Sequence, residues 1–104
     1  GYRPFTAFIF RDPGREAAMI VPAVDLHLAM ERTWIKDVRA YVMSELSTDI
    51  DTYFYPDFFA AAKAMLGERN VKGLTVGTEG ESLTAGFKDQ LHGLLESLGC
   101  KTVD

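Results

Sequence analysis

Two short apolar runs near the start of the chain, separated by a polar stretch, predict two β-strands joined by a turn with a bulge or a longer loop. Residues 5–10 are rich in aromatic and aliphatic side chains, and an apolar run resumes at residues 18–21. Between them stand Pro13, which presets φ for a turn, and Gly14, which accepts a positive φ. We therefore expect a β-hairpin whose second strand ends at Pro22.

Residues 25–46 show the spacing of an amphipathic helix. Asp25 is a favourable N-cap, and Trp34 widens the apolar side. The apolar positions that recur at helical spacing are Leu28, Ile35, Val38, Val42 and Leu46. We expect one long helix here, with a break near Thr33 as the alternative.

A second, shorter helix is predicted after Pro56, because proline suits the first turn of a helix. Its apolar positions are Phe58, Phe59, Ala62, Met65 and Leu66. Gly67 is the expected stop, since glycine readily adopts the left-handed conformation that ends many helices.

A strand near residues 71–76 and a third helix complete the pattern. Residues 78–81 read Thr-Glu-Gly-Glu, which matches the capping box that starts a helix. A leucine-rich stripe then extends to Leu98, and Gly99 marks its end. Residues 101–104 are either a last strand or a tail; if they pair beside residues 71–76, they complete a parallel crossover unit.

The order ββααβα, with a possible final strand, indicates an α+β fold. We expect a small sheet, built from the N-terminal hairpin and the strand near 71–76, packed on one face by about three helices. The 104 residues are expected to form a single domain over 1–104. Hydrophobic residues make up 47% of the chain and charged residues 25%, which argues against a disordered or fibrous protein.

Composition also narrows the partners and the location. The longest apolar runs are far shorter than the roughly 20 residues of a membrane span, so we expect no membrane contact. The net charge of −4 and the scattered Lys and Arg disfavour nucleic acid as a partner. Cys100 is the single cysteine and fits a reducing compartment, so we expect a cytoplasmic location. No cofactor and no metal site is expected.

The strongest compositional bias lies in residues 49–59, which hold five of the twelve aromatic side chains. Lys and Arg are absent from residues 40–62. Part of the segment is expected to be core, at Phe58 and Phe59, but three consecutive aromatic residues cannot all be buried on one face of a helix or strand. Exposed aromatic rings among carboxylates favour protein binding. The predicted binding residues are Asp49, Asp51, Tyr53, Phe54, Tyr55 and Asp57.

A second constellation suggests a ligand pocket. Helical projection places His27, Glu31 and Glu45 on the apolar side of the predicted long helix. A carboxylate and an imidazole at the rim of an apolar pocket would have shifted proton affinities, which suits acid–base chemistry. The simpler interpretation is that Glu31 lies early in the helix, where the helix dipole favours a negative charge, and that His27 borders the core.

We therefore expect a small non-enzymatic interaction module that uses the acidic aromatic surface. Its partner would be a protein, for which a basic surface is the expected match, or a second copy of the chain in a homodimer. The module would act as an inhibitor or immunity-type protein, or as a subunit of an assembly. The alternative is a small enzyme or ligand-binding domain with His27, Glu31 and Glu45 in an apolar pocket roofed by Trp34.

Overall fold

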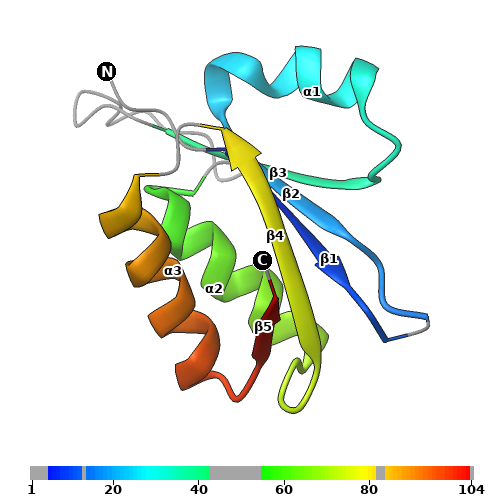
Figure 1. Cartoon of the computed structure of the whole chain (residues 1–104). Coiled ribbons are helices and arrows are strands. Elements are labelled where there is room, and N and C mark those ends of the chain that lie inside the picture. Colours follow the sequence, from blue (N-terminus) through cyan, green and yellow to red (C-terminus); the bar gives the residue numbers. More distant parts are fainter. Residues whose placement is uncertain (1–4, 13, 43–54, 82–83, 104) are drawn as a thin grey trace.

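A computed structural model describes residues 5–12, 14–42, 55–81 and 84–103 (Figure 1). Within these residues, five strands form one mixed sheet in the order β3-β2-β1-β4-β5. The strands are β1 (Phe5–Phe10), β2 (Ala18–Pro22), β3 (Asp37–Tyr41), β4 (Thr75–Glu81) and β5 (Lys101–Val103). The α-helices are α1 (Leu26–Arg32), α2 (Phe58–Arg69) and α3 (Ala85–Ser97), and a 3₁₀ turn, Ala23–Asp25, precedes α1. The predicted α+β class is confirmed.

Strand directions explain why the helices divide between the two faces of the sheet. Strand β1 is antiparallel to both of its neighbours, whereas β2–β3 and β4–β5 are parallel pairs. Strands β2 and β4 therefore point the same way. The connection from β2 through α1 leads to the edge strand β3, and the connection from β4 through α3 leads to β5 at the opposite edge. Because such crossovers are right-handed, they must place α1 and α3 on opposite faces. Figure 1 shows α1 apart from the α2–α3 layer.

The main core lies between the sheet and the layer formed by α2 and α3. Strands β1 and β2 turn alternate side chains toward these helices, among them Phe8, Phe10 and Ile20. The helices contribute Phe58, Ala61, Ala62, Met65, Leu66, Phe87, Leu91 and Leu95. The ring centroids of Phe58 and Phe87 lie 4.9 Å apart in an edge-to-face arrangement, which joins the two helices beneath the sheet.

The single long helix predicted over 25–46 is wrong, and the alternative break near Thr33 occurs. Helix α1 ends at Arg32, the Thr33 hydroxyl accepts a hydrogen bond from the Ile35 N–H, and β3 follows. Asp25 stands at the N-cap position of α1, but its side chain makes no capping hydrogen bond to this helix. The spacing misled because Val38 and Val42 are four residues apart, which repeats one face of a helix and also one face of a strand.

The start of α3 is also corrected. The Thr-Glu-Gly-Glu sequence at 78–81 is no capping box, because these residues belong to β4 and pair with residues 5–8 of β1. Helix α3 instead has Thr84 as its N-cap, whose hydroxyl accepts a hydrogen bond from the Phe87 N–H. The strand predicted at 71–76 is thus displaced along the chain, while the final strand beside it is confirmed as β5.

Helix α2 begins near the predicted position but runs past the predicted stop. Asp57 is its N-cap and accepts a hydrogen bond from the Ala60 N–H at 2.8 Å. Gly67 lies inside the helix, which ends at Asn70 in the left-handed conformation (φ 52°). The last turn continues because Glu68 and Arg69 both make contacts that hold it against β3.

Candidate functional site

The second face of the sheet is only partly covered. Helix α1 lies over β2 and β3, where it covers Val21. Strands β1, β4 and β5 have no helix over this face in the described part of the chain. We call this strip the open face; it consists of Phe5, Ala7, Ile9, Gly77, Glu79 and Val103, which alternation and cross-strand pairing place on one side.

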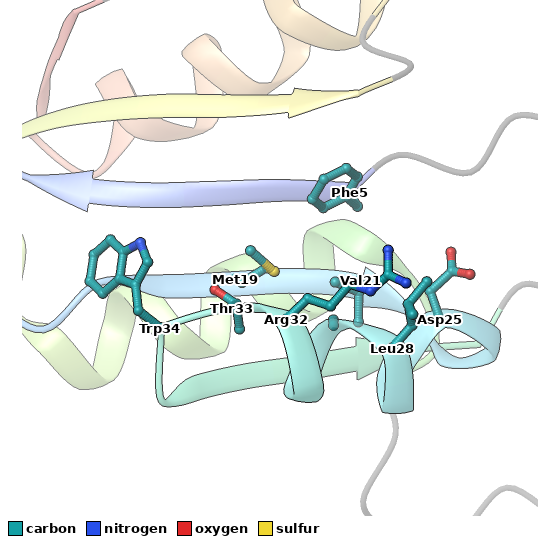
Figure 2. Close-up of a pocket in the computed structure, with 9 residues that line it drawn as sticks. Phe5, Met19, Val21, Asp25, Leu28, Arg32, Thr33 and Trp34 are labelled. Atoms are coloured by element: carbon teal, nitrogen blue, oxygen red, sulfur yellow. The ribbon is translucent and has the colours of Figure 1, made fainter.

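A groove of about 670 Å³ separates α1 from β1 (Figure 2). Its residues come from β1, β2, α1 and the turn after α1: Phe5, Met19, Val21, Asp25, Leu28, Ala29, Arg32, Thr33 and Trp34. A second hollow continues along the sheet past Ala7 and Ile9 to Glu79, with Trp34 shared between the two. Together they form an elongated, mainly apolar depression.

Trp34 is the most exposed large apolar side chain of this depression. Its side chain is 75% exposed, although tryptophan is highly buried on average. Ile9 (37%) and Val103 (39%) on the open face are also exposed. Figure 2 shows the Trp34 indole at one end of the groove, turned toward β1. Exposed apolar surface of this kind makes the depression a candidate interaction site.

Three charged side chains border the apolar surface. Asp25 and Arg32 lie on the α1 side, two helical turns apart, and Glu79 lies on β4 across the strip. Within the described residues, none of the three forms an ion pair. The α1 wall thus carries one uncompensated charge of each sign, and Glu79 adds a negative charge on the β4 side.

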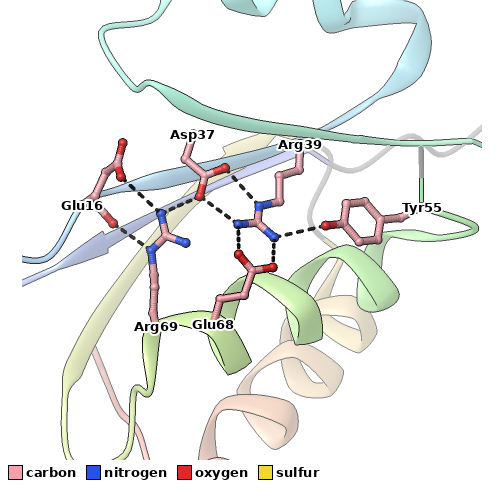
Figure 3. Close-up of polar contacts among 6 residues, drawn as sticks. All are labelled: Glu16, Asp37, Arg39, Tyr55, Glu68 and Arg69. Atoms are coloured by element: carbon pink, nitrogen blue, oxygen red, sulfur yellow. Dashed lines mark hydrogen bonds and ion pairs between the residues drawn. The ribbon is translucent and has the colours of Figure 1, made fainter. Parts of the chain in front are cut away.

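A separate polar cluster joins β3 to the end of α2 (Figure 3). Arg39 donates to both carboxylate oxygens of Glu68, at 2.8 and 2.9 Å, and to both oxygens of Asp37, at 3.0 and 3.2 Å. It also donates to the Tyr55 hydroxyl at 3.1 Å. Arg69 donates to Asp37 and to the backbone carbonyl of Glu16.

The charges of this cluster largely compensate one another. Burial alone would raise the pKa of Asp37, but hydrogen bonds and charge from Arg39 and Arg69 outweigh it and hold that pKa below its ordinary value. The hydrogen bonds to Glu68 and Asp37 raise the pKa of Arg39, and Arg39 in turn lowers the pKa of Glu68. Because each guanidinium already has its carboxylate, the cluster is better suited to holding the fold than to binding an ion.

Most of the predicted acidic aromatic surface lies outside the described residues, namely Asp49, Asp51, Tyr53 and Phe54. Tyr55 and Asp57 are described, and both have structural roles. The Tyr55 N–H donates to the Ala40 carbonyl of β3, and the Tyr55 carbonyl accepts from the Val42 N–H. The Tyr55 hydroxyl accepts a hydrogen bond from Arg39. Asp57 caps α2. Their participation in binding stays a prediction.

The predicted pocket residues are not gathered around the groove. His27 and Glu31 are exposed on α1 and are not among the residues that line the groove, whereas Glu45 lies outside the described residues. Trp34 does line the groove, and a pocket formed by His27, Glu31 and Glu45 stays a prediction. No three His, Cys, Asp or Glu side chains in the described ranges come together to hold a metal ion.

The sequence patterns missed Arg32, Glu79 and the Arg39 cluster. Glu79 falls within the sequence interpreted as a helix cap, and Arg32 falls within the range of the longer predicted helix, so neither points to a shared surface. The alternation Asp37-Val38-Arg39-Ala40-Tyr41 was the available signal for a strand with charged residues on one face.

Comparison of the chain with protein-family models, with curated proteins and with solved structures found no match. None of the helices formed by the described residues is long and apolar enough to cross a membrane. The candidate site is therefore defined by the geometry of the chain itself.

Proposed function

We propose that this chain is a protein-interaction module that binds through the open face and the groove beside it. The supporting observation is the 75% exposed Trp34 side chain at the end of an apolar groove. Tryptophan is enriched among the residues that dominate binding energy at protein interfaces. The acidic aromatic residues 49–57 are a second proposed contact surface, to be tested apart from the first.

This proposal keeps the predicted class, an inhibitor or an assembly subunit, and changes the surface that carries it. The free carboxylates of Asp25 and Glu79 support a partner with basic side chains, as the acidic bias of the chain also suggests. A cytoplasmic location is proposed as well, and it is supported by the buried free thiol of Cys100.

Photo-crosslinking from within the groove tests the proposal. Trp34 is replaced by p-benzoylphenylalanine in cells that produce the protein, and a matched protein carries the same probe at His27, which is exposed but outside the groove. We expect a discrete crosslinked adduct from position 34 and none from position 27. Equal adducts from both positions, or none from position 34, would reject the open face as the binding surface.

The groove also supports a second candidate, a ligand-binding domain. A volume of about 670 Å³ with mainly apolar walls and a few polar groups lies in the range of small-molecule sites. Asp25, Arg32 and Thr33 are the polar groups that such a ligand would meet, rather than His27 and Glu31. Native mass spectrometry of the purified protein distinguishes the two functions, since a retained small molecule favours this candidate.

A further inference from the structure

The uncovered strip of the sheet has the width of one helix. Neighbouring strands lie about 4.8 Å apart, so β1, β4 and β5 present a strip roughly 10–14 Å wide. An α-helix with its side chains is about 10–12 Å across. Helix α1 occupies the adjoining β2–β3 region, so one additional helix beside it would complete a layer on this face.

The relief of the open face also suits a helix. The small residues Ala7 on β1 and Gly77 on β4 lie within the open face, where a helix could approach the sheet closely. A Cβ added at Gly77 would make ordinary van der Waals contacts, 3.4 Å from the Val103 side chain and 3.8 Å from the Ile9 carbonyl oxygen. Because glycine has no side chain, the backbone of β4 is directly accessible at this position. Phe5, Ile9 and Trp34 stand around it as larger apolar contacts.

An extended peptide fits this face less well. The backbone groups of β1 already pair with β2 on one side and β4 on the other. An extended segment lying across the face would therefore bury N–H and C=O groups without partners, at a cost in free energy. A helix satisfies these groups internally and can lie on the apolar surface without that cost.

The charges on the two walls specify the polar positions of the occupant. Glu79 on β4 can pair with a Lys or Arg, and Arg32 on α1 can pair with an Asp or Glu. A helix lying between them would carry these two side chains on opposite flanks of its apolar stripe.

We propose that the open face binds one amphipathic helix of a partner protein. The helix has apolar residues against Phe5, Ile9 and Trp34, a basic residue at Glu79 and an acidic residue at Arg32. This inference rests on the proposed function and names the form of the partner.

Selection from a displayed library of random peptides of about 14 residues, roughly four helical turns, tests this inference. The full chain is the bait, and peptides that also bind an Ile9→Asp protein are removed. We expect the retained peptides to repeat apolar residues at i, i+3, i+4 and i+7 and to become helical on binding. Trp34→Ala should weaken them at least about tenfold.

Charge reversal provides the specific arm. When the Glu79→Lys protein is the bait, the retained peptides should carry an acidic residue at the position that is basic in peptides selected on the wild type. Glu96→Lys is the same change at an exposed site on α3, and with this bait the position should stay basic. Circular dichroism checks that each variant is folded. If Ile9→Asp is unfolded, Val103→Asp at the exposed end of the strip replaces it.

Three outcomes would overturn the inference. Peptides without helical periodicity that still require Ile9 and Trp34 would refute the helix but preserve the interaction face. If no retained peptide depends on these residues, the proposal of a helical partner is refuted. The crosslinking at position 34 would then test separately whether the open face binds a partner at all. A concentration-dependent homodimer of the chain that Ile9→Asp abolishes would identify a second copy as the occupant.

Discussion

Arg39 on β3 and Glu68 on α2 face each other in a two-pronged hydrogen-bonded pair, with N–O distances of 2.8 and 2.9 Å. The pair joins an edge strand to the last turn of a helix (Figure 3). Asp37 holds the same guanidinium from the other side. The side chains of Arg39 and Asp37 are only 14% and 19% exposed, so the charge of each is compensated mainly by the other members of this cluster.

Replacing Asp37 should destabilise the fold. Asp37→Ala leaves Arg39 and Arg69 without a shared carboxylate in a poorly hydrated position. We expect the free energy of unfolding to fall by about 2–4 kcal/mol, because removing one partner of a buried ion pair exposes the other to an uncompensated desolvation cost. Urea denaturation measures the loss. Asp89→Ala, at an exposed site on α3, is the control and should change stability by no more than about 0.5 kcal/mol.

The contribution of Asp37 should depend on pH in one direction. Its pKa in the folded protein lies below its ordinary value, so the unfolded state takes up protons first as the pH falls. The stabilisation is complete above the unfolded pKa of about 3.9 and is lost as the pH falls through the lower folded value. The difference in unfolding free energy between wild type and Asp37→Asn should therefore shrink from neutral pH to acid. A difference that grows in acid would contradict this assignment.

The sequence predicts those elements whose apolar pattern has a single interpretation. The α3 stripe runs through Phe87, Leu91, Leu94, Leu95 and Leu98, and its spacings of four, three, one and three residues fit a helix and no strand; a helix is found there. The segment around Val38 fits both, and its pairing with β2, Met19 opposite Val38, decides in favour of a strand. That contact is distant in sequence, so no local pattern contains it.

The candidate site was less accessible to prediction for the same reason. The exposure of Trp34 depends on the face that the β2–α1–β3 crossover takes, and the position of Glu79 depends on the antiparallel pairing of β4 with β1. Both follow from topology. The local sequence around Trp34 reads equally well as the apolar side of a buried helix.

The buried hydroxyl of Thr6 offers a test of what an unsatisfied polar group costs the fold. Its side chain is fully buried, and its hydroxyl has no hydrogen-bond partner among the residues that the structure describes. Replacing the hydroxyl by a methyl group of similar size removes an unsatisfied polar group, so Thr6→Val should stabilise the fold by about 1 kcal/mol. Thermal denaturation measures the change. Thr6→Ser retains the hydroxyl and loses the methyl group, and it should destabilise; stabilisation by both would refute this explanation.

Trp34 should contribute little to folding despite its size. With 75% of the side chain exposed, Trp34→Ala should change the unfolding free energy by no more than about 0.5 kcal/mol. Leu95→Ala, in the fully buried core, should cost about 2–5 kcal/mol. Since Trp34 is the single tryptophan, its emission should be that of a hydrated indole and iodide should quench it readily. A blue-shifted, protected emission at low protein concentration would contradict the exposed position.

Asn70 provides the last test, because it ends α2 in a conformation that few side chains adopt easily. Its φ of 52° lies in the left-handed region, and its N–H donates to the Gly67 carbonyl. Asn70→Ala should lower the unfolding free energy by about 1 kcal/mol, because a Cβ without a compensating polar group is disfavoured there. Asn70→Gly should be tolerated, since glycine populates this region without strain. Equal destabilisation by both substitutions, measured by urea denaturation, would show that the Asn70 side chain rather than its backbone conformation stabilises the end of α2.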